Sequence, residues 1–167
     1  DQGKLYPAFD MEFALGMRDL CKLADIIVPN ITEACFMLEK PYPGEDYDQA
    51  YIEDLLRELA ALGPGQVILT GVSFESDKIG AAAYNSEADS TDYYFTERIE
   101  GYYHGTGDIY SSALLAAVMN DKSLPESIRI ACDFTVAAIR RTHDAGTDPK
   151  YGVEFERELG TLIKMLG

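Results

Sequence analysis

Apolar residues recur along this chain at the spacings that helices and buried strands produce. A period of three or four residues predicts helices, and short β-branched runs or alternation predict strands. We therefore expect two buried parallel strands at 26–28 and 67–70, and a hairpin of strands at 79–84 and 91–96. The same patterns predict loops at 40–47 and 142–150 and helices at 13–21, 34–38, 52–62, 106–119, 123–139 and 159–166.

The alternation of strands with helices predicts an α/β layer fold with a largely parallel sheet flanked by helices. In such sheets, ligands bind outside the carboxyl ends of the strands. Asn30 and the pair Thr70-Gly71 follow the two buried strands, and a glycine-rich loop at 105–107 precedes a helix. We therefore expect the ligand site at that edge of the sheet, which the glycine-rich loop could also reach.

The composition is that of an ordinary globular protein and argues against several classes. Its 167 residues are enough for one domain, and no apolar run approaches the roughly 20 residues needed to span a bilayer. The net charge of −15 argues against nucleic acid as a partner. The three dispersed cysteines show no metal or disulfide spacing, which favours a reducing cytoplasm. The first residue is not methionine, so we expect the chain to begin inside a longer protein.

The stretch Gly105-Thr106-Gly107-Asp108 carries the most specific chemistry. Glycines let backbone N–H groups approach a ligand, and a helix start adds unpaired donors and partial positive charge, so the stretch suits phosphate oxygens. An aspartate would repel phosphate, but it fits a base that takes a proton from an attacking hydroxyl. The alternative is structural: Thr106 caps the helix and Asp108 complements its dipole.

Asn30 and Glu33 also admit two interpretations. Asn30-x-x-Glu33 is a capping-box pattern, in which each side chain accepts a hydrogen bond from the other residue's backbone N–H. It equally fits a carboxylate that holds Mg²⁺ near a triphosphate, because Mg²⁺ sites use one or two carboxylates with waters and phosphates. The two roles can coexist. Thr70-Gly71 offers a hydroxyl and a close backbone approach to phosphate, or simply ends a strand.

Five stretches of the chain, in collinear order, resemble pyridoxal kinase, a family of the ribokinase-like superfamily. They are residues 29–34, 70–72 and 105–112, the opening Asp1-Gln2-Gly3-Lys4-Leu5-Tyr6-Pro7, and the ending Tyr151-Gly152-Val153-Glu154-Phe155-Glu156. The opening and the ending point to pyridoxal kinase in particular, whereas Asn-x-Thr-Glu and Gly-Thr-Gly-Asp occur across the superfamily. The resemblance implies a three-layer ribokinase-like fold.

The resemblance also implies an enzyme that transfers the γ-phosphoryl group of ATP, with Mg²⁺, to the 5′-hydroxyl of pyridoxal, pyridoxine or pyridoxamine. It leaves open whether a monovalent cation is bound, and it implies that the intact parent is a cytoplasmic homodimer. The residues that it places at the site are the base Asp108, the anion hole of Gly105, Thr106 and Gly107, the ATP contacts Asn30, Thr70, Gly71 and Asp1, and the metal ligand Glu33.

The chain departs from the family in length, since the family has roughly a hundred residues before the position of Asp1. We therefore expect residues 1–167 to form one partial domain, the nucleotide-binding C-terminal part of such a kinase, with weak or no activity alone. The first rival is a hydroxymethylpyrimidine kinase of the same superfamily. The second is a non-catalytic nucleotide-binding module, and the third is a purely structural fragment.

Overall fold

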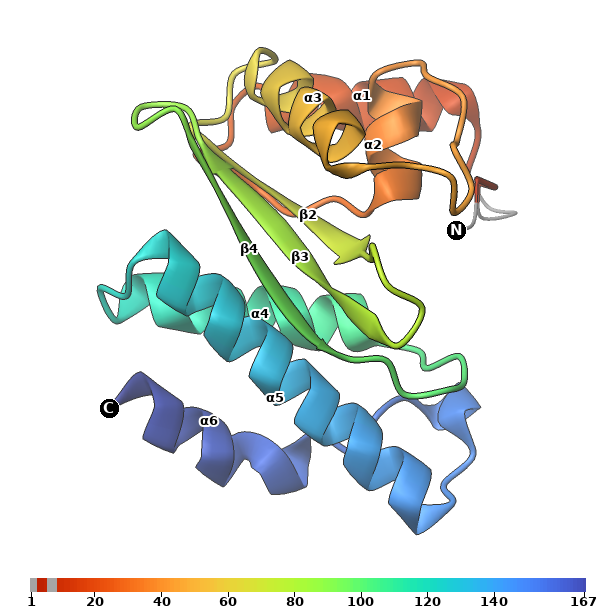
Figure 1. Cartoon of the computed structure of the whole chain (residues 1–167), viewed down its shortest axis with the longest axis vertical. Helices are drawn as coiled ribbons and strands as arrows, with labels where there is room; N and C mark the ends of the chain where they lie inside the picture. Colours follow the sequence, from red (N-terminus) through yellow and green to blue (C-terminus); the bar gives the residue numbers. More distant parts are fainter. Residues whose placement is uncertain (1–2, 6–8) are drawn as a thin grey trace. The chain divides into compact units, whose positions relative to one another are not determined.

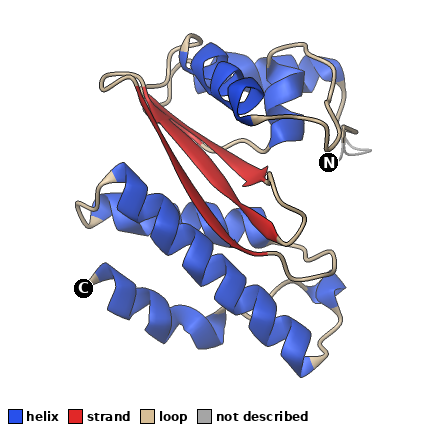
Figure 2. Ribbon diagram, viewed as in Figure 1, coloured by secondary structure: helices blue, strands red, loops and turns tan. Residues whose placement is uncertain are grey.

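The computed structural model describes residues 3–5 and 9–167, which fall into two compact units. Unit 1 holds the residues up to 74 together with 81–93, and unit 2 holds 75–80 and 94–167. The strands form one sheet in the order β1-β2-β3-β4, and Figures 1 and 2 show β2, β3 and β4 side by side. Their bounds are β1 Ile26–Ile27, β2 Gln66–Val72, β3 Lys78–Asn85 and β4 Ser90–Glu97, and the boundary between the units crosses β3 and β4.

In unit 1, the two predicted buried strands pair in parallel, as the sequence indicates. Ile26 lies opposite Gln66 and Ile27 opposite Val67. Beyond β1, an isolated parallel bridge joins Asn30 to Thr70. The helices of this unit are α1 Met11–Cys21, α2 Ile31–Met37 and α3 Gln49–Ala60. The parallel pair therefore brings the ends of both predicted strands together.

The core of unit 1 forms where α2 and α3 pack on β2. The apolar stripe of α3 is fully buried, and so are Val67 and Leu69 of β2 and Ala34 of α2. The stripe consists of Ile52, Leu55, Leu56 and Leu59. Each of these side chains contributes about 1.5–3 kcal/mol when buried, so the stripe stabilises the packing of α3. In contrast, α1 contains no buried residue.

The other two connections in the sheet are short. Five residues separate β2 from β3, and four separate β3 from β4. Parallel neighbours need a crossover of a dozen or more residues, so both connections are hairpins of antiparallel strands. The predicted hairpin is confirmed, and β1–β2 represents the parallel part of the sheet among the described strands.

Unit 2 is built from three helices, α4 Thr106–Met119, α5 Leu124–Ala145 and α6 Leu159–Leu166, with short 3₁₀ turns at Pro149–Tyr151 and Glu156–Glu158. Ala113 and Ala117 of α4 are fully buried, and these small side chains let α4 pack closely on α5. Two polar contacts attach α5 to the part of β4 in this unit: Tyr94 Oη donates to Asp133 Oδ1 at 2.8 Å, and Arg140 pairs with Glu97.

Helix α5 is longer than the sequence predicts. The loop expected at 142–150 is wrong for residues 142–145, which complete the helix. Thr142 lies inside the helix, and its hydroxyl donates to the carbonyl oxygen of Ala138, one turn earlier, at 2.8 Å. The helix ends at Gly146, whose φ of 64° is the left-handed cap that glycine favours. That glycine is the signal in the sequence for the true end of the helix.

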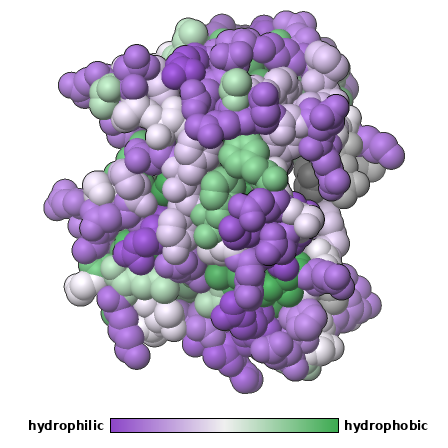
Figure 3. Space-filling view, in the orientation of Figure 1, coloured by the Kyte–Doolittle hydropathy of each residue, from purple (hydrophilic) through white to green (hydrophobic). Residues whose placement is uncertain are grey.

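The face of the molecule in Figure 3 is mostly hydrophilic, which agrees with the ordinary share of charged residues, 26%, in the sequence. Among residues 3–5 and 9–167, none of the helices combines the length and the apolar character needed to cross a membrane. The predicted cytoplasmic location, homodimer and single partial domain stay predictions.

Candidate active site

The start of α4 is an exposed turn with unpaired backbone donors. Gly105 is the N-cap residue, with a left-handed φ of 79° and no side-chain cap. The first helical hydrogen bond runs from the N–H of Ile109 to the carbonyl oxygen of Gly105 at 3.1 Å. The N–H groups of Thr106, Gly107 and Asp108 therefore have no acceptor within the helix, and the helix dipole adds partial positive charge. This arrangement suits an anion.

The two glycines of this turn leave space beside the backbone. A Cβ atom built at Gly105 or at Gly107 would meet no atom within 4 Å. Gly105 needs to be glycine for its positive φ, but Gly107 has ordinary helical geometry. Glycine in a helix costs up to about 1 kcal/mol relative to alanine, so nothing in unit 2 itself favours Gly107. A ligand that approaches the backbone there would explain it.

Packing orients Asp108 toward solvent. Asp108 is exposed in the first turn, whereas Ile109 and Tyr110 are buried. Burial raises the pKa of the Tyr110 hydroxyl, with Cys132 of α5 as a smaller cause, so Tyr110 is a neutral anchor rather than a proton carrier. Asp108 is therefore the acidic side chain that the start of α4 presents to solvent.

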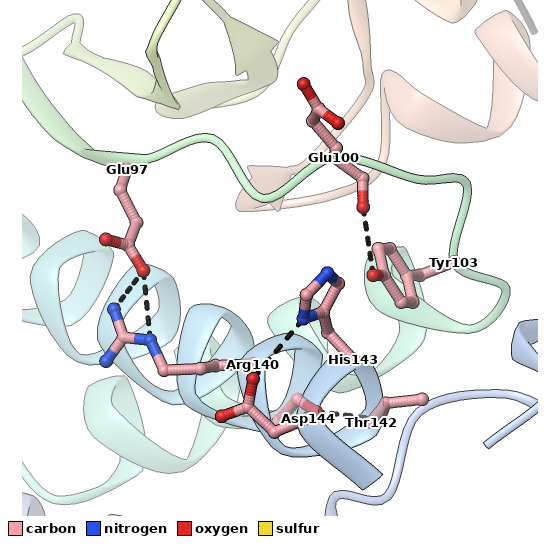
Figure 4. Close-up of polar contacts among 8 residues, drawn as sticks. Glu97, Glu100, Tyr103, Arg140, Thr142, His143 and Asp144 are labelled. Atoms are coloured by element: carbon pink, nitrogen blue, oxygen red, sulfur yellow. Dashed lines mark hydrogen bonds and ion pairs between the residues drawn. The ribbon is translucent and has the colours of Figure 1, made fainter. Parts of the chain in front are cut away.

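The loop before α4 is held by hydrogen bonds to its own carbonyl groups. Thr106 Oγ1 donates to the carbonyl oxygen of Tyr103 at 3.3 Å. Tyr103 Oη in turn donates to the carbonyl oxygen of Glu100 at 3.0 Å, as Figure 4 shows. The alternative in which Thr106 caps the helix is wrong, because Gly105 is the N-cap and the Thr106 hydroxyl is a donor to the loop.

The segment after α5 lies against this loop. The position that a Cβ would take at Gly152 lies 3.8 Å from the carbonyl oxygen of His104. The segment is anchored by the fully buried Thr142, whose Oγ1 accepts from the N–H of Glu154 at 2.8 Å, while Thr147 donates to the Glu154 carboxylate. The ending that resembles pyridoxal kinase therefore lies beside the residue that precedes the glycine loop. Sequence patterns did not reveal the role of Thr142, because a threonine in a helix carries no such signal.

The second group of predicted site residues lies in unit 1. Asn30 Oδ1 accepts from the N–H of Glu33, and Glu33 Oε2 accepts from the N–H of Asn30, both at 2.9 Å. The capping box is thus confirmed. It uses one oxygen of the exposed Glu33 carboxylate, so the other oxygen can contact a ligand.

Thr70 and Gly71 lie beside this cap. The N–H of Thr70 donates to the carbonyl oxygen of Pro29 at 3.0 Å, next to the Asn30–Thr70 bridge. Gly71 has a positive φ of 74° with open space around it. Within unit 1, Asn30, Glu33, Thr70 and Gly71 therefore form one group, as the sequence predicts, while Gly105–Asp108 form another in unit 2. Asp1, the remaining predicted ATP contact, lies outside the described residues.

The two histidines and the possible metal ligands are the remaining candidates. His104 and His143 are exposed; the ring of His104 lies edge-on to Tyr102, and His143 contacts Asp144 at 3.3 Å (Figure 4). No cluster of three or more His, Cys, Asp or Glu side chains that could hold a metal occurs in residues 3–5 and 9–167. A metal at Glu33 would therefore take most of its ligands from nucleotide phosphates and water, which suits Mg²⁺.

Comparison with known sequences identifies the family. The sequence model of the phosphomethylpyrimidine kinase family matches residues 8–152. The chain belongs to this family. A curated relative, the hydroxymethylpyrimidine/phosphomethylpyrimidine kinase of Aquifex aeolicus, is 28% identical over 130 residues, which are 77% of this chain and 48% of the relative.

Solved structures of the same fold include pyridoxal kinases. A Bacteroides thetaiotaomicron protein described as a phosphomethylpyrimidine kinase was crystallised with pyridoxal. It is 34% identical to this chain with a TM-score of 0.91, and the match covers 97% of this chain and 57% of the Bacteroides chain. The pyridoxal kinase of Lactobacillus plantarum is 29% identical with a TM-score of 0.86, and the match covers 99% of this chain and 58% of the Lactobacillus chain. The predicted α/β fold and the resemblance to pyridoxal kinase are thus confirmed. The chain spans about half the length of these family members.

Proposed function

We propose that this chain is the nucleotide-binding part of a kinase that transfers the γ-phosphoryl group of ATP to a hydroxymethyl group on a nitrogen-containing aromatic ring. The observation that carries the proposal is the start of α4. There, the unpaired N–H groups of Thr106 and Gly107 and the exposed carboxylate of Asp108 share one turn. Membership of a kinase family supports the same reaction class.

The chemistry follows from that turn. The Asp108 carboxylate takes the proton of the attacking hydroxyl as the oxygen approaches the γ-phosphorus. The N–H groups of the glycine turn donate to phosphoryl oxygens, where negative charge is held during transfer. The proton passes to Asp108 and the phosphoryl group passes to the alcohol, with ADP as the leaving group. Catalysis of this kind depends on positioning, and the segment at Gly152, which lies against His104, would help to hold the turn in place.

Glu33 is the proposed metal contact, with Asn30 and Thr70 beside the ATP phosphates. The cap leaves Glu33 one carboxylate oxygen for Mg²⁺, and the neighbouring Gly71 gives open backbone space. When bound, Mg²⁺ would neutralise phosphate charge during the transfer. Asp1 remains a proposed ATP contact on the strength of the resemblance.

Pyridoxal, pyridoxine or pyridoxamine is the first proposed substrate. The opening and ending motifs favour it, and a relative 34% identical to this chain was crystallised with pyridoxal. Hydroxymethylpyrimidine is the second proposed substrate, favoured by the family match and the Aquifex relative. Both alcohols carry a hydroxymethyl group on an aromatic ring, so the same base and anion site would serve either.

Two experiments test the proposal. The first is titration of this chain with MgATP by calorimetry, in which we expect saturable binding that weakens at least tenfold in Thr70→Ala. Glu33→Gln is the sharper variant, because glutamine keeps the capping box but removes the charge. Weaker binding of MgATP with unchanged binding of metal-free ATP would support a metal role for Glu33. Equal effects on both would contradict it.

The second experiment competes pyridoxal and hydroxymethylpyrimidine for phosphoryl transfer by the full-length kinase that carries this sequence. Preference for pyridoxal supports the first substrate, and the opposite preference supports the second. MgATP binding without transfer to either alcohol would favour the non-catalytic module. Absence of nucleotide binding would leave only a structural fragment.

A further inference from the structure

The turn at the end of β2 is held on both sides of Gly71. Before Gly71, the N–H of Thr70 donates to the carbonyl oxygen of Pro29 at 3.0 Å. After Gly71, the N–H of Ser73 donates to the hydroxyl oxygen of Tyr47 at 3.0 Å. Gly71 itself is exposed, with open space around it. The backbone that a phosphate group could approach therefore lies between two fixed points, and Tyr47 supplies the second.

Tyr47 reaches this turn from a distant part of unit 1. It is half-buried at the end of the loop 40–47, which carries no predicted site residue. It directly precedes Asp48, the N-cap of α3, whose carboxylate accepts from the N–H of Tyr51 at 2.9 Å. The start of α3 therefore fixes the backbone that carries the Tyr47 side chain.

Neighbouring rings fix the orientation of the Tyr47 ring. Its centroid lies 6.3 Å from that of Tyr51 and 6.2 Å from that of Phe74, the second pair in an edge arrangement. The ring of Phe74 lies 6.0 Å from that of Tyr93 in β4. Tyr93 in turn donates from its hydroxyl to the carboxylate of Glu53 in α3 at 3.3 Å. The row of rings thus holds the Tyr47 hydroxyl at the turn before any ligand arrives.

We propose that Tyr47 is a positioning residue for the nucleotide. By accepting from the N–H of Ser73, its hydroxyl holds the turn at Gly71 in the conformation that receives a phosphate group. Glycine has more backbone freedom than any other residue, so a fixed point on each side lowers the entropy that the turn loses when a ligand binds. The inference rests on the proposed function, because it assigns Tyr47 a role in binding the ATP phosphates.

The alternative is a purely structural role for the Tyr47 hydroxyl. A backbone N–H that loses its acceptor costs stability whether or not a ligand binds. The two roles differ in what Tyr47→Phe changes, since phenylalanine keeps the ring and removes the hydroxyl. A structural role predicts a loss of stability alone, whereas a positioning role also predicts a loss of affinity for the nucleotide.

Calorimetric titration and thermal unfolding of the same preparations test the proposal. We expect Tyr47→Phe to weaken MgATP binding about three- to tenfold, the factor that one hydrogen bond supplies. Metal-free ATP should lose affinity by the same factor, because Tyr47 acts on the turn and not on the cation. The matched control is Tyr84→Phe, which removes a 2.9 Å hydrogen bond to Asp89 near the other end of β3. It should lower the Tm to a similar extent and leave the affinity unchanged.

A second variant, Gly71→Ala, shows whether Tyr47 acts through the turn. Alanine disfavours the positive φ of 74°, so Gly71→Ala should weaken MgATP binding by itself. Since both residues act on one turn, the double variant should lose less affinity than the product of the two single losses.

Three results would overturn this inference alone, provided that the unsubstituted chain binds MgATP. They are unchanged affinity in Tyr47→Phe, an equal loss of affinity in Tyr84→Phe, and single losses that simply multiply in the double variant. An unsubstituted chain that does not bind MgATP would overturn the inference together with the proposed nucleotide site.

Discussion

Gly107→Ala should have opposite effects on the stability of the fold and on the binding of a ligand. Gly107 is the second residue of α4, and a Cβ there meets no atom within 4 Å. Alanine should therefore stabilise unit 2 through its helix propensity, by up to about 1 kcal/mol. For a chain of this length, that corresponds to a rise in Tm of about 2–4 °C. At the same time, the added methyl group would stand where phosphate oxygens approach the backbone.

Helix α6 provides a matched control for this prediction. Gly160 is also the second residue of its helix, and a Cβ there likewise meets nothing within 4 Å. Gly160→Ala should raise the Tm by a similar amount and leave nucleotide binding unchanged. Gly107→Ala should weaken MgATP binding at least tenfold, about 1.4 kcal/mol. Gly105→Ala should instead destabilise by about 1–2 kcal/mol, because its φ of 79° disfavours side chains.

Thermal unfolding and calorimetric titration of the same preparations measure both effects. Stabilisation with unchanged affinity in Gly107→Ala would refute the reasoning that a ligand keeps this position glycine. A large loss of stability would refute the reading that the space beside Gly107 is empty.

The remaining predictions concern the base and the supports of the loop. Asp108→Asn should lower phosphoryl transfer about 100- to 10,000-fold in a kinase assay, without weakening MgATP binding, because it removes the base and a repulsive charge. Thr142→Val should cost about 1–3 kcal/mol in urea unfolding, since it leaves the N–H of Glu154 without its acceptor; Thr161→Val, whose hydroxyl serves the side chain of Glu158, should cost less. The hydrogen bond from Arg141, at 2.5 Å, holds the pKa of Glu158 below its usual 4.5, so this carboxylate stabilises the fold above pH 4.5 and less as the pH falls through its folded pKa. Glu158→Gln should accordingly lower the free energy of unfolding at pH 7. The variant should also lose less of that free energy than the parent chain when the pH falls below 4.5. The same loss in both proteins would contradict the assignment.

The strongly patterned elements could be predicted from the sequence. The range 106–119 matches α4, and 159–166 matches α6, because apolar spacing and glycine or proline punctuation agree there. The prediction failed at the end of α5. Residues 142–145 remain helical although the apolar pattern of the helix stops at Ile139. Gly146 was the more reliable marker of the helix end.

The residue types of the candidate site could be predicted from the sequence, but most of the contacts that hold them in place could not. The adjacency of Asn30 and Thr70 followed from the rule that parallel strands end at one edge, and the bridge between them confirms it. The approach of Gly152 to the carbonyl oxygen of His104 could not be predicted, because it joins residues almost fifty positions apart. The exposure of Phe13, Met17 and Leu20 on α1 was also beyond prediction, since an amphipathic pattern predicts that its apolar side is buried.

The capping box at Asn30 and Glu33 has a consequence for the entropy of ligand binding. A free glutamate side chain loses about 1.5–2 kcal/mol of rotamer entropy when it is immobilised. Folding of α2 has already restricted Glu33, because its carboxylate bonds to the N–H of Asn30 at 2.9 Å. A cation that binds the remaining oxygen therefore meets a side chain with little conformational freedom left to lose. A residue that looks purely structural in the free protein can in this way make a later binding step tighter.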